Sequence, residues 1–348
     1  MIVTVVGAGC AGRTMVLSLL RNFSNIQLNL LDENPLSSKL SCGYAAAGMV
    51  APYSEAATLG ESKLYLDGLK SLKLWPLLLE QLESPERIFK QNGTLVLAHP
   101  NDQSDFQYFS RQLSSCIECN SNDYLVAPIE LEKVEKSLPV NKFHRESIHF
   151  DREACIQVPE FYKATTTYFQ SHPNVHIRQQ KINEIHPKNF NESDFIIDCR
   201  GMGKSYFDES IRGLRGESIV VYAPDVDIKH TIRLIHPRYP IYITPRSNNI
   251  YYIGATTVEN TDSSEISVKS TMELLSALYV VHPGFSESRI LKLISQVRPA
   301  TQSGYPEVNW ENNVVSINGL NRHGYLLSPV ICNQVCAGIK EKESLHEY

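Results

Sequence analysis

Three glycines near the start of the chain have the spacing of a diphosphate-binding turn. Gly7, Gly9 and Gly12 form the pattern G-x-G-x-x-G after an apolar run at 2–6. Glycine lets the backbone turn tightly and approach a phosphate, and the N-terminus of the following helix offers unpaired N–H groups and a partial positive charge. Asp32 ends the next apolar run, where its carboxylate can accept hydrogen bonds from a ribose diol. The predicted nucleotide contacts are Gly7, Gly9, Ala11, Gly12, Asp32 and Glu33.

The elements around these glycines must place them at one end of a sheet. The run at 2–6 predicts a strand, the residues after Gly12 have apolar positions at helical spacing, and 26–31 predicts a second strand. Strand, turn, helix, strand and acid is the context in which this pattern binds a dinucleotide. A glycine turn that binds no ligand is the alternative, and the complete context disfavours it. The pattern alone does not separate NAD from FAD.

Composition and charge disfavour several classes of partner. The 348 residues are 42% hydrophobic and 20% charged, with a formal charge of −5 and no long basic run, so neither a nucleic acid nor an anionic membrane surface is expected to bind. No apolar stretch reaches the roughly 18 residues that a membrane span requires. The first predicted strand begins at Ile2, which leaves no room for a signal peptide, so we expect a cytoplasmic protein.

Two kinds of sheet are predicted, interleaved along the chain. After the opening unit come a long helix at 59–82, kinked at Pro76, and a strand at 176–185. From 218 onward, short β-rich segments between turns favour an antiparallel sheet, and a final strand–turn–helix, with its helix at 329–339, returns to the first domain. We expect a mixed α/β fold: a Rossmann-like nucleotide-binding domain with a parallel sheet, interleaved with an antiparallel-sheet substrate domain. The predicted ranges are 1–85, 148–215 and 296–348 for the first domain and 86–147 and 216–295 for the second.

Three further blocks carry a family resemblance. They read GYAAAGMVAP at 43–52, VRPAT at 297–301 and GLNRHGYLLSP at 319–329. Together with the opening pattern, they make the chain resemble the D-amino acid oxidase and glycine oxidase family of FAD-dependent oxidoreductases. The resemblance covers nearly the whole chain and is weakest over 102–147. A glycine-containing turn before a helix also suits the third block to hold negative charge on a reduced flavin.

The resemblance implies FAD as the cofactor, lodged between the two sheets. It implies oxidative deamination of a small amino acid or amine, with hydride transfer to the flavin and reoxidation by O2 to give H2O2. The small residues of the second block would run along the flavin ring. By this resemblance, the cofactor-binding residues are Gly7, Gly9, Ala11, Gly12, Asp32, Glu33, Ala46, Ala47, Gly48, Met49, Gly201, Arg298, Arg322, His323, Gly324, Tyr325 and Leu326.

Three residues are predicted to border the substrate. Arg298 is the first choice for the substrate carboxylate, because a planar guanidinium pairs with a carboxylate through two parallel hydrogen bonds. An internal salt bridge is the alternative for Arg298. Tyr242 matches a tyrosine in the active site of the family, or is a half-buried aromatic of the sheet. Arg322 either borders the site or pairs with an acid.

The chain departs from the family pattern at positions close to the expected reacting face. Leu320 replaces a histidine, His323 replaces an asparagine, and Gln296 replaces a glycine. These changes put ordinary glycine turnover in doubt. They leave open a modifying enzyme that acts on a side chain of a partner protein, such as the maturation of a quinone cofactor. A NAD-linked dehydrogenase and a non-catalytic flavin-binding module are further alternatives, and the third block argues against NAD.

Other residues with chemical potential have weaker patterns. Cys116 and Cys119 form a single C-x-x-C, which is better explained by chance than by a redox pair, and a second pair for zinc is missing. Cys42 precedes the flavin-contact segment, so a covalent flavin link is a minor alternative. No metal site is expected, because His230, His236 and His282 do not have metal-ligand spacing.

Overall fold

A six-stranded sheet forms one half of the molecule, in the order β15-β16-β9-β1-β2-β8. This is a computed structural model, and it describes residues 1–117, 131–139, 147–205, 210–238 and 240–346. Within the sheet, β15 pairs antiparallel with β16 and the other neighbours are parallel. The strands are β1 (Ile2–Val6), β2 (Gln27–Asp32), β8 (Val175–Gln179), β9 (Phe195–Asp198), β15 (Glu307–Glu311) and β16 (Val314–Asn318).

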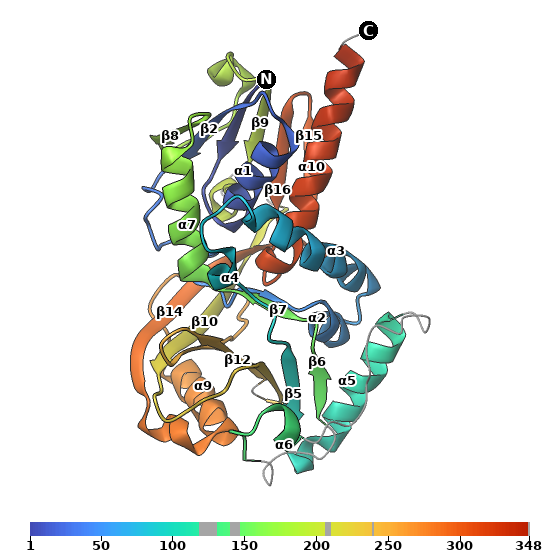
Figure 1. Cartoon of the computed structure of the whole chain (residues 1–348), viewed down its shortest axis with the longest axis vertical. Helices are drawn as coiled ribbons and strands as arrows, with labels where there is room; N and C mark the ends of the chain where they lie inside the picture. Colours follow the sequence, from blue (N-terminus) through green and yellow to red (C-terminus); the bar gives the residue numbers. More distant parts are fainter. Residues whose placement is uncertain (118–130, 140–146, 206–209, 239, 347–348) are drawn as a thin grey trace.

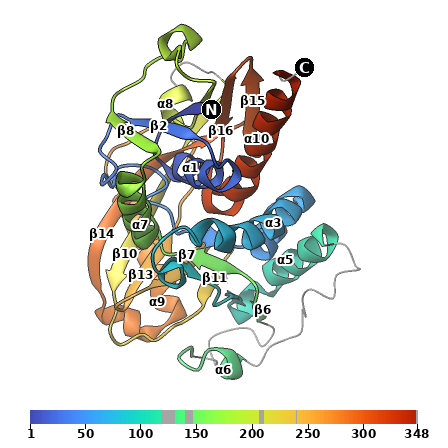
Figure 2. The same ribbon diagram turned by 45° about the horizontal axis from the view of Figure 1, so that its top comes forward.

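Helices cover this sheet because each presents an apolar face to it. Residues of the first strands, such as Val3 and Leu28, are fully buried in one core with residues from the covering helices. Both the N-terminus and α10 lie in this half of the molecule (Figures 1 and 2). The helices that share this core are α1 (Cys10–Asn22), α7 (Val158–Ser171), α10 (Gly324–His346) and α3 (Ser62–Leu79), the last packed on α10 and α1.

A seven-stranded sheet forms the other half, in the order β14-β10-β13-β12-β11-β5-β6. Its neighbours pair antiparallel, except that β5 runs parallel to β11. The helix α9 (Val268–Val281) packs against it over a second core. The strands are β5 (Thr94–Ala98), β6 (Ile148–Phe150), β10 (Arg212–Tyr222), β11 (Thr231–Ile235), β12 (Ile241–Arg246), β13 (Ile250–Gly254) and β14 (Arg289–Ala300).

The remaining elements complete the structure, and some of them lie between the two halves. A small sheet in the order β3-β7-β4 lies between them, and α2 packs against α3 and α5. Both views show this region between the two larger sheets (Figures 1 and 2). These elements are α2 (Pro52–Leu59), α4 (Pro85–Ile88), α5 (Gln103–Cys116), α6 (Leu131–Val134), α8 (Met202–Ser205), β3 (Met49–Val50), β4 (Phe89–Lys90), β7 (Ala154–Ile156), and the 3-10 turns Pro100–Asp102, Pro187–Phe190 and Pro283–Glu287.

The predicted fold class, a parallel-sheet unit interleaved with an antiparallel sheet, is confirmed. Several element boundaries were wrong. The helix expected at 59–82 is α3, which begins at Ser62 and ends at Leu79, because Gly60 adopts a left-handed φ of 70° that ends α2 before it. The strand expected at 176–185 ends at Gln179, and the last helix begins at Gly324 with Pro329 inside it.

The domain ranges remain a prediction. β6 pairs with β5 in the seven-stranded sheet although it opens the range 148–215. The long strands β10 and β14 pair along almost their whole length and run across the predicted limits at 215 and 296. Among the described residues, no helix is both long and apolar enough to cross a membrane.

Six of the described cysteines are buried. They are Cys10, Cys116, Cys155, Cys199, Cys332 and Cys336, while Cys42 is half-buried, and all seven are free thiols. Burial raises the pKa of the Cys10 thiol to about 12 and that of the Cys155 thiol to about 11. No group of three or more His, Cys, Asp or Glu side chains in the described part of the chain is arranged to hold a metal ion.

Candidate active site

A cleft of about 1260 Å³ is lined by residues of both sheets. Its walls come from the start, the middle and the end of the chain. All the residues predicted to contact cofactor or substrate line this cleft, with the exception of Gly12. The fold therefore brings together residues that are up to about 320 positions apart in the sequence, such as Gly7 and Leu326.

The three glycines of the opening turn have different steric surroundings. Gly7 has a φ of +99°, and a Cβ there would lie 2.6 Å from the Cys199 carbonyl oxygen. A Cβ on Gly12 would lie 1.8 Å from the Gly7 carbonyl oxygen, so only glycine lets α1 close on the turn. A Cβ on Gly9 would meet nothing within 4 Å. The backbone at Gly9 thus faces open space in the cleft, while Gly7 and Gly12 are needed for packing.

Asp32 lies at the tip of β2 and holds the turn in place. Its Oδ2 accepts a hydrogen bond from the Ala8 N–H (2.7 Å) and its Oδ1 accepts one from the Asn34 N–H (2.8 Å). The N-terminus of α1 begins beside it, with no acidic residue in its first turn and no side-chain cap. This end of the cleft therefore presents backbone N–H groups that can donate hydrogen bonds to a bound anion.

Arg13 is a buried cation beside this turn, and the sequence analysis did not identify it. Its guanidinium donates to the Ala8 carbonyl (2.9 Å), the Thr165 hydroxyl (2.7 Å) and the Leu36 carbonyl (2.5 Å), and lies over the Tyr162 ring. Burial lowers the pKa of Arg13. Within the described ranges it forms no ion pair with an acidic side chain, so its charge adds to the positive potential of this end.

The small residues at 45–49 form one wall, and their carbonyl groups are anchored from the other sheet. Tyr252 donates its hydroxyl to the Ala45 carbonyl (2.5 Å), and Arg246 donates to the Ala47 carbonyl (2.6 Å). These two anchors were missed, because an arginine and a tyrosine in a strand have no distinctive sequence signal. The wall is consequently fixed relative to both sheets.

The turn at 319–323 and the start of α10 form the opposite end. Gly319 has a φ of +74°, and the Asn321 N–H donates to the Pro299 carbonyl (2.8 Å). The Tyr325 hydroxyl donates to the Gly43 carbonyl (2.9 Å), which ties α10 to the small-residue wall. The Asn321 Oδ1 is buried, and no partner for it is found among the described residues. This second helix N-terminus has no acidic residue in its first turn.

Glu55 of α2 organises the charges beside this turn and was also missed. It accepts from Arg233 (2.6 Å), from His323 Nε2 (3.1 Å) and from Arg322 Nη2 (3.4 Å), and its Oε2 forms an ion pair with Arg322 Nε at 3.2 Å. Burial by itself would raise the pKa of Glu55, but Arg322 and Arg233 hold it well below its usual value of 4.5. Burial lowers the pKa of His323. Arg322 thus pairs with an acid, the second of the two predicted alternatives, and it also lines the cleft.

Arg298 and Tyr242 lie in the same part of the cleft. Among the described residues Arg298 makes no ion pair with an acid, and its Nη1 is 3.5 Å from the Thr257 hydroxyl. Tyr242 is half-buried and stacks on Tyr252, with ring centroids 6.3 Å apart. Burial raises the pKa of Tyr242, and the nearby Arg298 and Arg322 oppose that rise. The guanidinium of Arg298 is thus left available to an anion in the cleft.

The substituted positions and the weaker candidates also have defined places. Gln296, Leu320 and His323 all line the cleft, as does Cys42. Cys116 is buried in the core beneath α5, and Cys119 lies outside the described residues. The three histidines do not line this cleft and make polar contacts of their own. His230 pairs with Glu135 at 2.9 Å. The Nδ1 atoms of His236 and His282 accept from the backbone N–H groups of Arg238 and Gly284, respectively.

A nucleotide-binding βαβ unit, a second helix N-terminus at the far end and a cleft shared with an antiparallel sheet define a dinucleotide-dependent oxidoreductase. A family model described as DAO, FAD dependent oxidoreductase, matches residues 3–337. The chain therefore belongs to this family, and the family implies FAD as its cofactor.

Individual relatives agree with this assignment. A Rhizobium etli protein named as a thiamine biosynthesis oxidoreductase, ThiO, is 30% identical over 96% of this chain and 94% of its own length. A D-amino acid oxidase of Dugesia ryukyuensis is 23% identical over 86% of this chain and 83% of its own. The crystal structure of glycine oxidase from Geobacillus kaustophilus superimposes with a TM-score of 0.78 at 20% identity, covering 98% of this chain and 94% of that one.

Proposed function

We propose that this chain is an FAD-dependent oxidase that deaminates a small amino acid or amine, with O2 as the final electron acceptor. The single observation that carries the proposal is the placement of Arg298. Its guanidinium has no acidic partner among the described residues, yet it lines the same cleft as the nucleotide turn. A small ligand with a carboxylate is the natural partner of such a cation. The names of the relatives, an amino acid oxidase among them, support the same substrate class.

The residues of the cleft fit FAD at both ends. The open space above Gly9 and the uncapped start of α1 suit a diphosphate, and Asp32 suits a ribose. At the other end, the start of α10 and the unpaired Asn321 Oδ1 suit a polar ring edge. When bound, FAD supplies the two-electron acceptor for the substrate. The small side chains at 45–49 leave room for a flat ring against that wall.

The side chains at the substrate end bind and orient. Arg298 holds the carboxylate through two parallel hydrogen bonds, and the ring of Tyr242 limits the space beside it. Glu55 offsets the charge of Arg322 and Arg233, so that Arg298 is the cation left for the ligand. The positive end of the α10 dipole stabilises negative charge that develops at its N-terminus. The proposed reaction requires no catalytic nucleophile among these side chains.

Two measurements on the purified protein test this function. Absorption bands at about 370 and 450 nm are expected from bound FAD, and their absence after reconstitution would contradict the proposal. A peroxide assay across glycine, sarcosine, D-alanine, proline and simple amines is then expected to give turnover with at least one of them. Silence across that panel with FAD intact would contradict a small-molecule oxidase and direct the search to a side chain on a partner protein.

A further inference from the structure

The guanidinium of Arg298 rests directly on the backbone of Gly216. A Cβ added to Gly216 would lie 2.1 Å from Arg298 Nη2, 2.3 Å from its Cζ and 2.7 Å from its Nε. The two residues belong to the paired strands β10 and β14, in which Gly216 lies opposite Gln296 and Leu214 lies opposite Arg298. The guanidinium therefore fills the space that any other side chain at 216 would need.

Thr257 closes the second side of this position. Arg215 and Val258 exchange two backbone hydrogen bonds of 2.9 Å, and the Thr256 N–H donates to the Glu217 carbonyl (3.1 Å). These contacts on either side place Thr257 opposite Gly216, and its hydroxyl accepts from Arg298 Nη1 (3.5 Å). We call Gly216 and Thr257 the guanidinium seat. Both residues line the main cleft.

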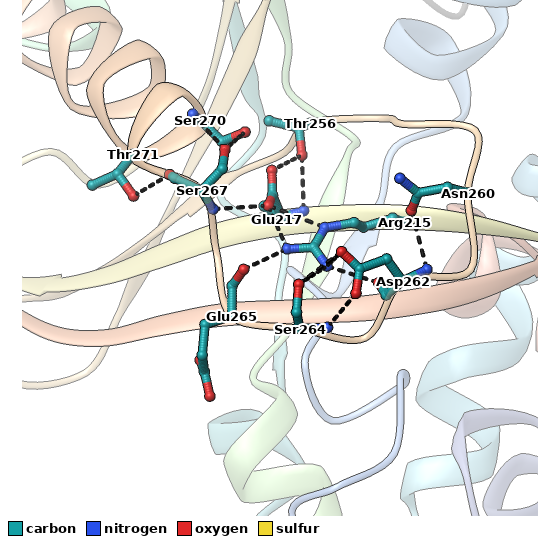
Figure 3. A network of polar contacts seen from close by, with 10 residues as sticks. All are labelled: Arg215, Glu217, Thr256, Asn260, Asp262, Ser264, Glu265, Ser267, Ser270 and Thr271. Carbon is teal, nitrogen blue, oxygen red and sulfur yellow. Dashed lines mark hydrogen bonds and ion pairs between the residues drawn. The ribbon is translucent and has the colours of Figure 1, made fainter.

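A buried ion pair fixes the seat from the other face of β10. Arg215 Nη2 is 2.8 Å from Glu217 Oε1, and both side chains are almost completely buried. Arg215 also donates to the carbonyls of Asp262 (2.7 Å) and Glu265 (2.6 Å), which closes the segment 255–266 around it. The Thr256 hydroxyl donates to Glu217 Oε2 (3.1 Å), as Figure 3 shows. Thr257 therefore belongs to a segment that has little freedom to move away from Arg298.

We propose that Gly216 and Thr257 are positioning residues that set the height and orientation of the Arg298 guanidinium, and thereby select substrates that carry a carboxylate. This inference rests on the proposed function, in which Arg298 binds that carboxylate. A guanidinium lying flat on glycine presents its donors at a fixed depth in the cleft. A side chain at 216 would lift it toward the space that the substrate occupies, and the two-pronged contact would lose its geometry.

The substitution Gly216→Ala tests the seat. The atoms it displaces are the far end of a flexible side chain, so FAD content and melting temperature are expected to stay as in the wild type. The dissociation constant of acetate, read from the visible spectrum of the bound FAD, and the KM for glycine are expected to rise roughly 10- to 100-fold. Thr257→Val keeps the shape but loses one hydrogen bond, and is expected to weaken acetate about fivefold.

A double-mutant cycle separates positioning from general damage to the sheet. In an Arg298→Ala background, Gly216→Ala is expected to cause no further loss of acetate affinity, because the group that it displaces is gone. Equal losses in both backgrounds would overturn the inference. Val221→Ala, a core truncation on the same strand, is the control: it lowers the melting temperature and leaves acetate affinity unchanged.

The outcomes also distinguish this inference from the proposed function. Acetate that leaves the wild-type spectrum unchanged, or an Arg298→Ala variant that binds acetate as well as the wild type, contradicts the role of Arg298 and with it the proposed function. A large loss in Arg298→Ala together with an unaffected Gly216→Ala contradicts the guanidinium seat alone.

Discussion

Glu55 is the residue on which the charges of the substrate end depend. One buried carboxylate faces two arginines and a histidine, at distances between 2.6 and 3.2 Å. Its negative charge offsets the charges of Arg233 and Arg322, and in the described part of the chain it forms no ion pair that would neutralise Arg298. The electrostatics of the site therefore rest on a residue that does not belong to any of the recognisable motifs.

We predict that Glu55→Gln destabilises the protein by about 3–5 kcal/mol, since Arg233 and Arg322 are left facing each other without an anion. The contribution of the ionised Glu55 is present above pH about 4.5, its usual pKa, and is lost as pH falls through the lowered pKa of the folded state. Urea unfolding at pH 7 measures the effect. Glu259→Gln, which breaks an exposed pair with Arg212, is the control and is expected to cost less than about 1 kcal/mol. Equal costs for the two variants would contradict this account.

Residues with a strict backbone requirement were the ones that sequence reasoning located. Gly7 and Gly12 could be placed because their spacing reflects a steric need that the structure displays as contacts of 2.6 and 1.8 Å. Arg298 was found through its motif. Gly216, by contrast, is an ordinary glycine in a strand until the position of Arg298 is known. Whether Arg298 has an acidic partner could not be predicted, because the answer depends on side chains that the fold brings near it from distant parts of the sequence.

At the scale of elements, α2 joins the small-residue wall at 45–49 to the end of the cleft that holds Arg322 and His323. It begins at Pro52, immediately after the small-residue segment, and carries Glu55. Its first turn is held by Glu153, which accepts from the Ser54 N–H (2.7 Å) and the Ser54 hydroxyl (3.0 Å). Burial raises the pKa of Glu153 to about 7, although hydrogen bonds from Thr94 and Ser54 oppose the rise.

The raised pKa of Glu153 predicts a pH-dependent stability. The folded state holds this proton up to about pH 7, whereas the unfolded chain releases it near 4.5, so folding is favoured at low pH and the advantage is lost as pH rises through 7. The full loss is about 3 kcal/mol. Glu153→Gln carries a neutral amide at every pH. The free energy of unfolding of this variant, relative to that of the wild type, is therefore expected to increase between pH 5 and pH 8. If the free energies of unfolding of the two proteins, measured in urea, changed with pH in the same way, Glu153 would not titrate in this range.

Elements with a strong local signal were predicted, and those set by distant contacts were not. The strand at 2–6 was located correctly, but its parallel pairing with β9 depends on a segment more than 180 residues away. The helix predicted at 59–82 began too early, because Leu59 belongs to α2 and the left-handed Gly60 separates it from α3. The predicted strand at 176–185 was too long, since only its first part has a neighbour in the sheet.

At the scale of the molecule, residues from both large sheets line the cleft. A cofactor lying across this cleft contacts both halves at once. Its binding free energy therefore adds to the stability of the folded state and is absent from the unfolded one.

We predict that removal of FAD lowers the melting temperature, and that adding it back raises the temperature in proportion to the logarithm of its concentration. At 100 times the dissociation constant the stabilisation is about 2.7 kcal/mol. Differential scanning calorimetry of the stripped protein with increasing FAD measures this effect. Riboflavin, which lacks the diphosphate and the adenosine, is expected to stabilise far less. A melting temperature indifferent to FAD would contradict the placement of the cofactor between the two sheets.

The alternation of the two sheet types along the chain was predictable, because the change from βαβ spacing to short, turn-punctuated strands is local. The order β15-β16-β9-β1-β2-β8 was not, since it depends on which strands find each other after the chain has crossed between halves. A site between the two sheets was expected from the sequence. The ion pairs of Glu55 with Arg233 and Arg322 were not, because they join residues that only the folded chain brings together.

The buried thiols have a consequence for an enzyme of the proposed kind. Peroxide attacks the thiolate and not the thiol, and a cysteine with a pKa of about 12, such as Cys10, is ionised in only about one molecule in 100,000 at neutral pH. Cys10 lines the very cleft in which peroxide would be released. An enzyme of the proposed kind would thus keep reduced sulfur within reach of its own oxidising product, protected by the burial of the thiol.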